Sequence, residues 1–192
     1  MEDGLDRFRV AQQQFFRTAL EEIEAGQKVS HWMWYIFPQI TGLGFSSISK
    51  QYAIKDMKEA RDYLADETLR QNLIDMCVAL LQNQSNDATE IMGYPDDMKL
   101  RSCMTLFALA DSRYEVFQKV LDKFFDGKKD EKTIRILKNQ IPTDDWTKIC
   151  NENVDVPAFL SRIQKMQSGE SMECPFCGGT VTMVEHLAGI II

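Results

Sequence analysis

The chain has 192 residues, of which 44% are hydrophobic and 27% charged, and its formal net charge is −7. This balance is typical of a globular protein large enough to bury a real core, and an acidic chain without a basic stripe is a poor partner for nucleic acid. Its longest apolar runs are far shorter than the roughly 20 residues that cross a bilayer. With no charged-then-apolar leader at its start, we expect a cytoplasmic protein that binds no membrane.

The first part of the chain carries strong helix signals. Apolar residues recur at spacings of three and four from Leu5 to Ala25, and Gly26 offers a left-handed stop. Ser30 is a candidate cap for a short aromatic helix that Pro38 ends. Further amphipathic patterns predict helices over 57–65, where Asp56 and Glu59 resemble a capping box, and over 67–82.

Helix signals of the same kind continue to residue 141. It predicts a turn over 88–92, a strong helix over 95–110, a helix opened by Ser112, and a last helix capped by Asp130. We therefore expect an all-α, compact multi-helix domain over residues 1–141. Residues 142–192 form an extension in which we expect two short helices and a Cys-x-x-Cys tail with a small β-hairpin near 180–184.

One aromatic segment stands out, from Ser30 through Ser-His-Trp-Met-Trp-Tyr-Ile-Phe-Pro-Gln into a turn with two glycines. Trp32 and Trp34 offer flat faces for a planar heterocycle, His31 suits acid-base chemistry near neutral pH, and Gln39 borders the glycine turn. The alternative is that the tryptophans are ordinary core and that His31 has a capping or structural role.

A second motif, Pro-Asp-Asp-Met-Lys-Leu-Arg-Ser, opens the helix over 95–110. Lys99 and Arg101 are candidate anion ligands, and Ser102 and Thr105 are candidate hydroxyl donors, if this helix faces the aromatic segment. In the alternative, Arg101 pairs with Asp97 on the surface and the two hydroxyls bond back to helix carbonyls.

Four of the five cysteines form two groups, and Cys150 is isolated. Cys77 and Cys103 lie inside apolar helical patterns, which predicts buried free thiols. Cys174 and Cys177 form half of a zinc-ribbon-like site that His186 and one further ligand would complete around Zn²⁺. Reduced, unliganded cysteines and a redox pair are the alternatives.

These motifs together resemble an uncharacterised family, domain of unknown function 1810. The resemblance rests on the aromatic segment, the following Gly-Leu-Gly-Phe-Ser, and the Pro-Asp-Asp-Met-Lys-Leu-Arg-Ser motif with its Met-Thr-Leu-Phe continuation, and it spans residues of about 5–138. It implies a compact, mostly helical domain with no established reaction. The chain departs from the family pattern at Tyr94 and Cys103, so we do not include Cys103 among the functional residues.

Two functional hypotheses stay open at this point, and the sequence does not decide whether the protein is an enzyme. In the first, the two motifs line a pocket that binds or processes an anionic heterocyclic small molecule of nucleotide or ADP-ribose type. In the second, the protein is a non-catalytic helical interaction module whose tail binds zinc or docks a partner. The apolar end over 187–192 would then pack on the helical domain or on a second subunit of a homo-oligomer.

Overall fold

The structure is a computed structural model that describes residues 4–140 and the short segments 171–173 and 180–182. The chain divides into two compact units, residues 1–140 and 141–192. The helices of the first unit are α1 (Asp6–Glu24), α2 (Met33–Ile36), α3 (Ser47–Gln51), α4 (Met57–Ala65), α5 (Glu67–Gln82), α6 (Ala88–Met92), α7 (Asp96–Ala110), α8 (Val116–Phe125) and α9 (Glu131–Gln140). Residues 4–140 are therefore helical and contain no named strand, which confirms the all-α prediction for this part of the chain.

The helix ends follow the predicted chemistry at most positions. Gly26 ends the first helix with a φ of +80°, a conformation that costs glycine little. The carboxylate of Asp56 caps α4 by accepting the N–H of Glu59 at 2.8 Å, and Asp66 caps α5 in the same way. Asp130 accepts the N–H of Thr133 at 2.9 Å and so caps α9.

Two predicted helix starts are wrong. Ser30 does not cap the aromatic helix, because its N–H and hydroxyl both bond to the carboxylate of Glu22 on α1, and α2 begins after Trp32 without a side-chain cap. Ser112 does not open α8, which begins at Val116. The short helix α3 was not predicted. Its N-cap is Ser46, whose hydroxyl accepts the N–H of Ser49.

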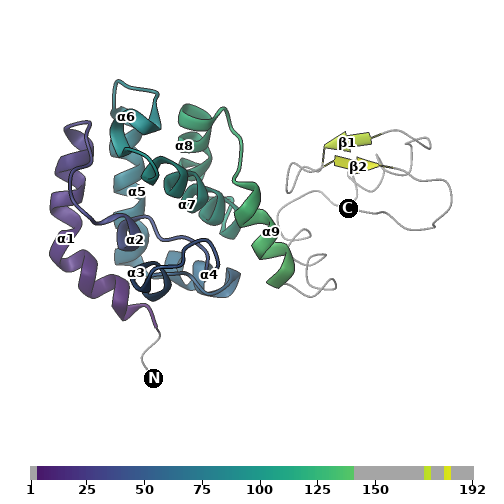
Figure 1. Cartoon of the computed structure of the whole chain (residues 1–192), viewed down its shortest axis with the longest axis horizontal. Coiled ribbons are helices and arrows are strands. Elements are labelled where there is room, and N and C mark those ends of the chain that lie inside the picture. The colour runs from purple at the N-terminus through teal and green to yellow at the C-terminus, as the bar shows by residue number, and fades with distance from the viewer. Residues whose placement is uncertain (1–3, 141–170, 174–179, 183–192) are drawn as a thin grey trace. The chain divides into compact units, whose positions relative to one another are not determined.

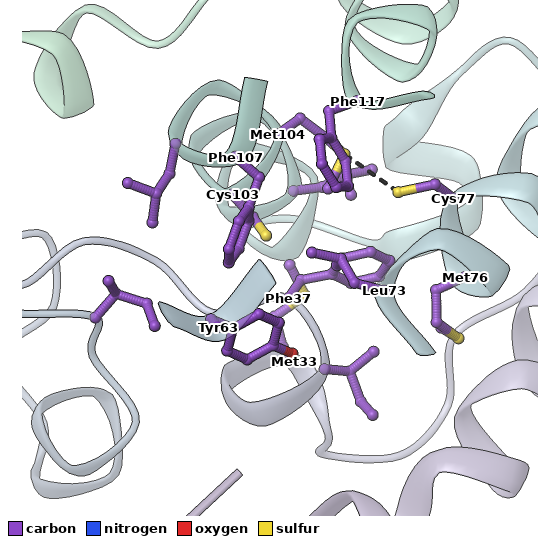
Figure 2. Packing of buried hydrophobic residues seen from close by; sticks show 14 of the residues in the cluster. Met33, Phe37, Tyr63, Leu73, Met76, Cys77, Cys103, Met104, Phe107 and Phe117 are labelled. Atoms are coloured by element: carbon purple, nitrogen blue, oxygen red, sulfur yellow. Dashed lines mark hydrogen bonds between the residues drawn. The ribbon is translucent and has the colours of Figure 1, made fainter. Parts of the chain in front are cut away.

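The core forms around α7, which contacts α4, α6, α8 and α9 (Figure 1). Since it is packed on several sides, α7 buries most of its residues, among them Cys103, Met104 and Phe107. Figure 2 shows how these side chains meet the Tyr63 ring of α4 and the Phe117 ring of α8. The Tyr63 and Phe107 ring centroids are 5.1 Å apart, a spacing at which aromatic pairs attract beyond simple burial.

The second unit is described only in part. Strands β1 (Ser171–Glu173) and β2 (Thr180–Thr182) pair antiparallel, with Met172 opposite Val181. The helices expected between residues 142 and 166 lie outside the described residues. None of the helices in the described part of the chain has the length and apolar composition that a membrane-spanning helix needs.

Candidate functional site

The tryptophan just before α2 and the tryptophan within it differ in burial. Trp32 is 1% exposed, and its indole N–H donates to the Glu22 carboxylate at 2.7 Å. Trp34 is only half-buried and lies against the edge of the core. Of the two predicted stacking residues, Trp34 alone is therefore partly exposed.

Trp34 borders a small pocket between α2 and α3. Its lining runs over residues 39–44 and continues with Ser49, Lys50, Tyr52 and Ala53. The cavity volume is about 20 Å³, which is room for one or two groups the size of a water molecule and not for a whole nucleotide. Gln39, a predicted site residue, lies in this lining.

The glycine turn gives the pocket its shape. Gly42 has a φ of +95°, which a residue with a Cβ rarely adopts. At Gly44 an added Cβ would lie 2.5 Å from the Cβ of Ser49, so this position has no room for a side chain. The backbone N–H groups of Gly42, Leu43 and Gly44 have no acceptor among the described residues.

The second motif reaches the first through Lys99. Its ammonium lies 4.1 Å from the centroid of the Trp34 ring and donates to Asp96 Oδ1 at 2.7 Å. The other oxygen of Asp96 is 2.7 Å from the ammonium of Lys28, which lies 5.0 Å from the centroid of the Trp32 ring. Burial works to raise the pKa of Asp96, but the hydrogen bonds from Lys28 and Lys99 outweigh it and hold the pKa below its usual range.

The other predicted residues of this motif lie elsewhere. Arg101 does not pair with Asp97; its guanidinium donates to the backbone carbonyls of Lys128 and Lys129, both at 2.9 Å. The single hydroxyl proton of Ser102 is shared between two acceptors, the carboxylate of Asp130 at 3.0 Å and the carbonyl of Met98 at 3.1 Å.

Thr105 belongs to the same group of contacts. Its hydroxyl donates to the Arg101 carbonyl at 2.8 Å and accepts the N–H of Asp130 at 2.8 Å. Arg101 thus joins α7 to the loop before α9, and Ser102 and Thr105 join α7 to Asp130 at the start of α9. The alternative that both hydroxyls bond back to helix carbonyls is confirmed.

The remaining predicted site residues do not reach the pocket or are not described. His31 is exposed on the segment before α2 and does not line the pocket. Cys174, Cys177 and His186 lie outside the described residues. Across the part of the chain that is described, no group of three or more His, Cys, Asp or Glu side chains is arranged to hold a metal ion.

Sequence reasoning missed several residues of this region. Lys50 and Tyr52 line the pocket from α3 and its end; Tyr52 belongs to the pattern that resembles the family but was not predicted as a site residue, and Lys50 had no signal beyond its closeness to the glycine turn. Glu22 and Lys28 hold the aromatic segment from α1 and from the loop that follows it. Their role depends on contacts between elements, and only the spacing of α1 from the aromatic segment could have suggested it.

Two of the comparisons with known proteins find a match to this chain. The family model described as "Protein of unknown function (DUF1810)" matches residues 2–137. The structure is similar to that of the conserved hypothetical protein Rv1873 from Mycobacterium tuberculosis, with 40% sequence identity, a TM-score of 0.68, and coverage of 70% of this chain and 96% of that chain. None of the curated proteins matches. The chain therefore belongs to the DUF1810 family of proteins of unknown function.

Proposed function

We propose that the helical unit binds an anionic heterocyclic small molecule of nucleotide type at the pocket beside Trp34. The observation that carries the proposal is the contact between Lys99 and Trp34, because it brings the two sequence motifs together at the edge of this pocket. The ligand's planar ring would lie on the accessible part of the indole, and its anionic end would enter the pocket.

The aromatic part of the site can contribute substantially to affinity. Stacking of a base on an aromatic side chain is worth about 1–3 kcal/mol. Trp34 keeps an accessible part of its ring, while the ammonium of Lys99 covers another part of it at 4.1 Å. The contact with Lys99 restricts the indole, so less side-chain entropy is lost when a ligand binds.

The pocket itself has the chemistry of an anion site. Its lining contains Lys50 and no Asp or Glu, and the turn at residues 42–44 offers backbone N–H groups that have no acceptor among the described residues. A positive φ within such a turn is typical of the backbone concavities that bind anions. The small volume suits one or two oxygen atoms of a phosphate or carboxylate group, with the rest of the ligand outside.

The proposal assigns no reaction to the protein. His31, the predicted acid-base group, does not line the pocket, and Arg101, Ser102 and Thr105 are committed to contacts with the start of α9 and the loop before it. We therefore assign the contact with the ligand's anionic group to Lys50 and not to Arg101. Lys99 remains the residue that contacts the stacking ring of Trp34.

Isothermal titration calorimetry with AMP, ADP-ribose and NAD tests this proposal. Saturable binding of at least one of them is expected. Lys50→Glu, which reverses the charge at the pocket, should weaken binding at least tenfold, equivalent to about 1.4 kcal/mol. Lys119→Glu makes the same charge change at a residue of α8 that is not among the lining residues, and this variant should bind as the unmodified protein does. No binding of any of the three compounds would refute the proposal.

A non-catalytic interaction module with a zinc-binding tail is the second candidate. The internal hydrogen bonds of Arg101, Ser102 and Thr105 favour it, because three of the predicted ligand contacts then serve the fold alone. In this case Cys174, Cys177 and His186 would bind Zn²⁺ and the tail would dock a second subunit.

Zinc content and oligomeric state distinguish this candidate from the first. The full chain purified with Zn²⁺ should retain about one ion per chain and show a mass above that of a monomer in light scattering. Changing Cys174→Ser and Cys177→Ser together should remove both properties. A metal-free monomer under these conditions would exclude this second candidate.

A further inference from the structure

Trp34 is connected to the interior of the protein through a short series of charged groups, and we propose that Asp96 is the positioning residue that fixes Trp34 at the pocket. Asp96 Oδ1 accepts a hydrogen bond from Lys99 Nζ at 2.7 Å, and that ammonium lies 4.1 Å from the centroid of the Trp34 ring. Asp96 does not line the pocket, so it acts on Trp34 through Lys99. The inference rests on the proposed function for its effect on binding and on the structure alone for its effect on Trp34.

Lysine does not hold such a position unaided. Its ammonium is a strongly hydrated point charge on a flexible four-carbon chain, and a cation over an aromatic ring gains only about 0.5–1 kcal/mol at exposed sites. The side chain of Lys99 is 22% exposed, so water competes for its ammonium. A second, charged partner is needed to keep Lys99 over the indole, and Asp96 supplies it.

Asp96 is itself held in place from the opposite side. Its Oδ2 atom lies 2.7 Å from Lys28 Nζ, and the side chain of Lys28 is only 7% exposed. Lys28 also donates from its ammonium to the Ser30 carbonyl and from its backbone N–H to the Ile91 carbonyl, both at 2.7 Å. Because both of its carboxylate oxygens bond to lysines, Asp96 is held in one orientation. Its Oδ1 atom therefore holds the ammonium of Lys99 at one position.

The neighbouring carboxylate does not share this arrangement. Asp97 also lies in the first turn of α7, but its Oδ2 atom accepts from the hydroxyl of Thr89 at 2.9 Å, and no lysine pairs with it among the described residues. The two carboxylates therefore have the same position relative to the helix dipole and different contacts. Asp97→Asn is a matched control for Asp96→Asn.

The experiment has two readouts on the full-length chain. The first needs no ligand: in ¹H–¹³C spectra, the Hε protons of Lys99 should be shifted upfield by the ring current of Trp34, with the resonance assigned from a Lys99→Arg variant. The second is calorimetric titration with AMP. Asp96→Asn should move the Lys99 resonance downfield toward that of an exposed lysine and weaken AMP binding by about three- to tenfold. Asp97→Asn should change neither.

A double variant addresses the case in which Asp96→Asn fails to fold because Lys28 is left without its partner. Asp96→Asn combined with Lys28→Met removes both charges, and it should give the same downfield movement of the Lys99 resonance. A Lys99 resonance that keeps its upfield position in a folded Asp96 variant overturns the inference. If the unmodified protein does not bind AMP, ADP-ribose or NAD, the proposed function fails, and the Lys99 resonance alone then supports or overturns the positioning role of Asp96.

Discussion

The indole N–H of Trp32 donates a hydrogen bond to the carboxylate of Glu22, with 2.7 Å between Nε1 and Oε2. The same carboxylate accepts the backbone N–H groups of Val29 and Ser30, at 2.7 Å and 3.0 Å. One side chain of α1 thus binds the whole segment that leads into α2. This contact keeps Trp32 in the core and leaves Trp34 as the tryptophan at the pocket.

Glu22→Gln is expected to destabilise the protein. The amide cannot accept from all of these donors with the strength of a charged group, so the free energy of unfolding should fall by about 1–3 kcal/mol. Urea denaturation followed by tryptophan fluorescence measures the change. Glu21→Gln is the control, because among the described residues the side chain of Glu21 makes only an exposed pair with Arg17, and its loss should cost less than about 0.5 kcal/mol. Equal losses for the two variants would contradict this account.

Glu22 also predicts how stability depends on pH. Partial burial works to raise its pKa, but the hydrogen bonds from Ser30, Val29 and Trp32 dominate and lower the pKa from 4.5 to about 2. Because the pKa is lower in the folded state, the stabilisation is complete above about pH 5 and is lost as the pH falls toward 2. The difference in unfolding free energy between the unmodified protein and Glu22→Gln should therefore shrink over this range. A difference that stays constant from pH 7 to pH 2 would contradict the prediction.

Gly44→Ala is expected to disturb the pocket through a steric clash. The new Cβ would lie 2.5 Å from the Cβ and 2.6 Å from the Oγ of Ser49, which forces α3 and the glycine turn apart. A loss of about 1–3 kcal/mol is expected, measured by urea denaturation. The double variant with Ser49→Gly removes the clashing atoms and should recover part of this loss. A Gly44→Ala protein as stable as the original would show that the turn gives way without cost.

Cys77 and Cys103 are expected to be unreactive in the folded protein. Both are fully buried, and burial raises the pKa of each thiol because it disfavours the thiolate. Iodoacetamide at pH 8 should leave both unmodified in the native protein and alkylate both in urea, as mass spectrometry of the tryptic peptides will show. Alkylation of either cysteine under native conditions would indicate that this part of the core opens.

Much of the helical unit was predictable because its signals are local. The periodic apolar positions of α1, the glycine after it, and the aspartates that cap α4 and α9 act over a few residues each. At Ser30 the local pattern gave a wrong prediction. It is a good cap by type, but Glu22 on α1 offers a charged acceptor, and the charged contact is stronger than the cap.

The sequence indicated which two motifs contribute to the candidate site, but it did not indicate which residues of each motif reach it. Trp34 and Lys99 meet as the sequence reasoning required, whereas Arg101 turns toward the loop before α9. Two residues along a helix rotate a side chain by about half a turn, so neighbours within one motif face different elements. Which of them faces the pocket depends on how α7 packs.

The family, the all-α character of residues 4–140 and the positions of most helices follow from the amino-acid sequence, since they depend on patterns and caps within single segments. The burial of Trp32, the place of Trp34 at a pocket and the position of Asp96 between two lysines became visible in the folded chain alone. Burial and ion pairing join residues far apart in the chain, and the packing of whole helices selects their partners.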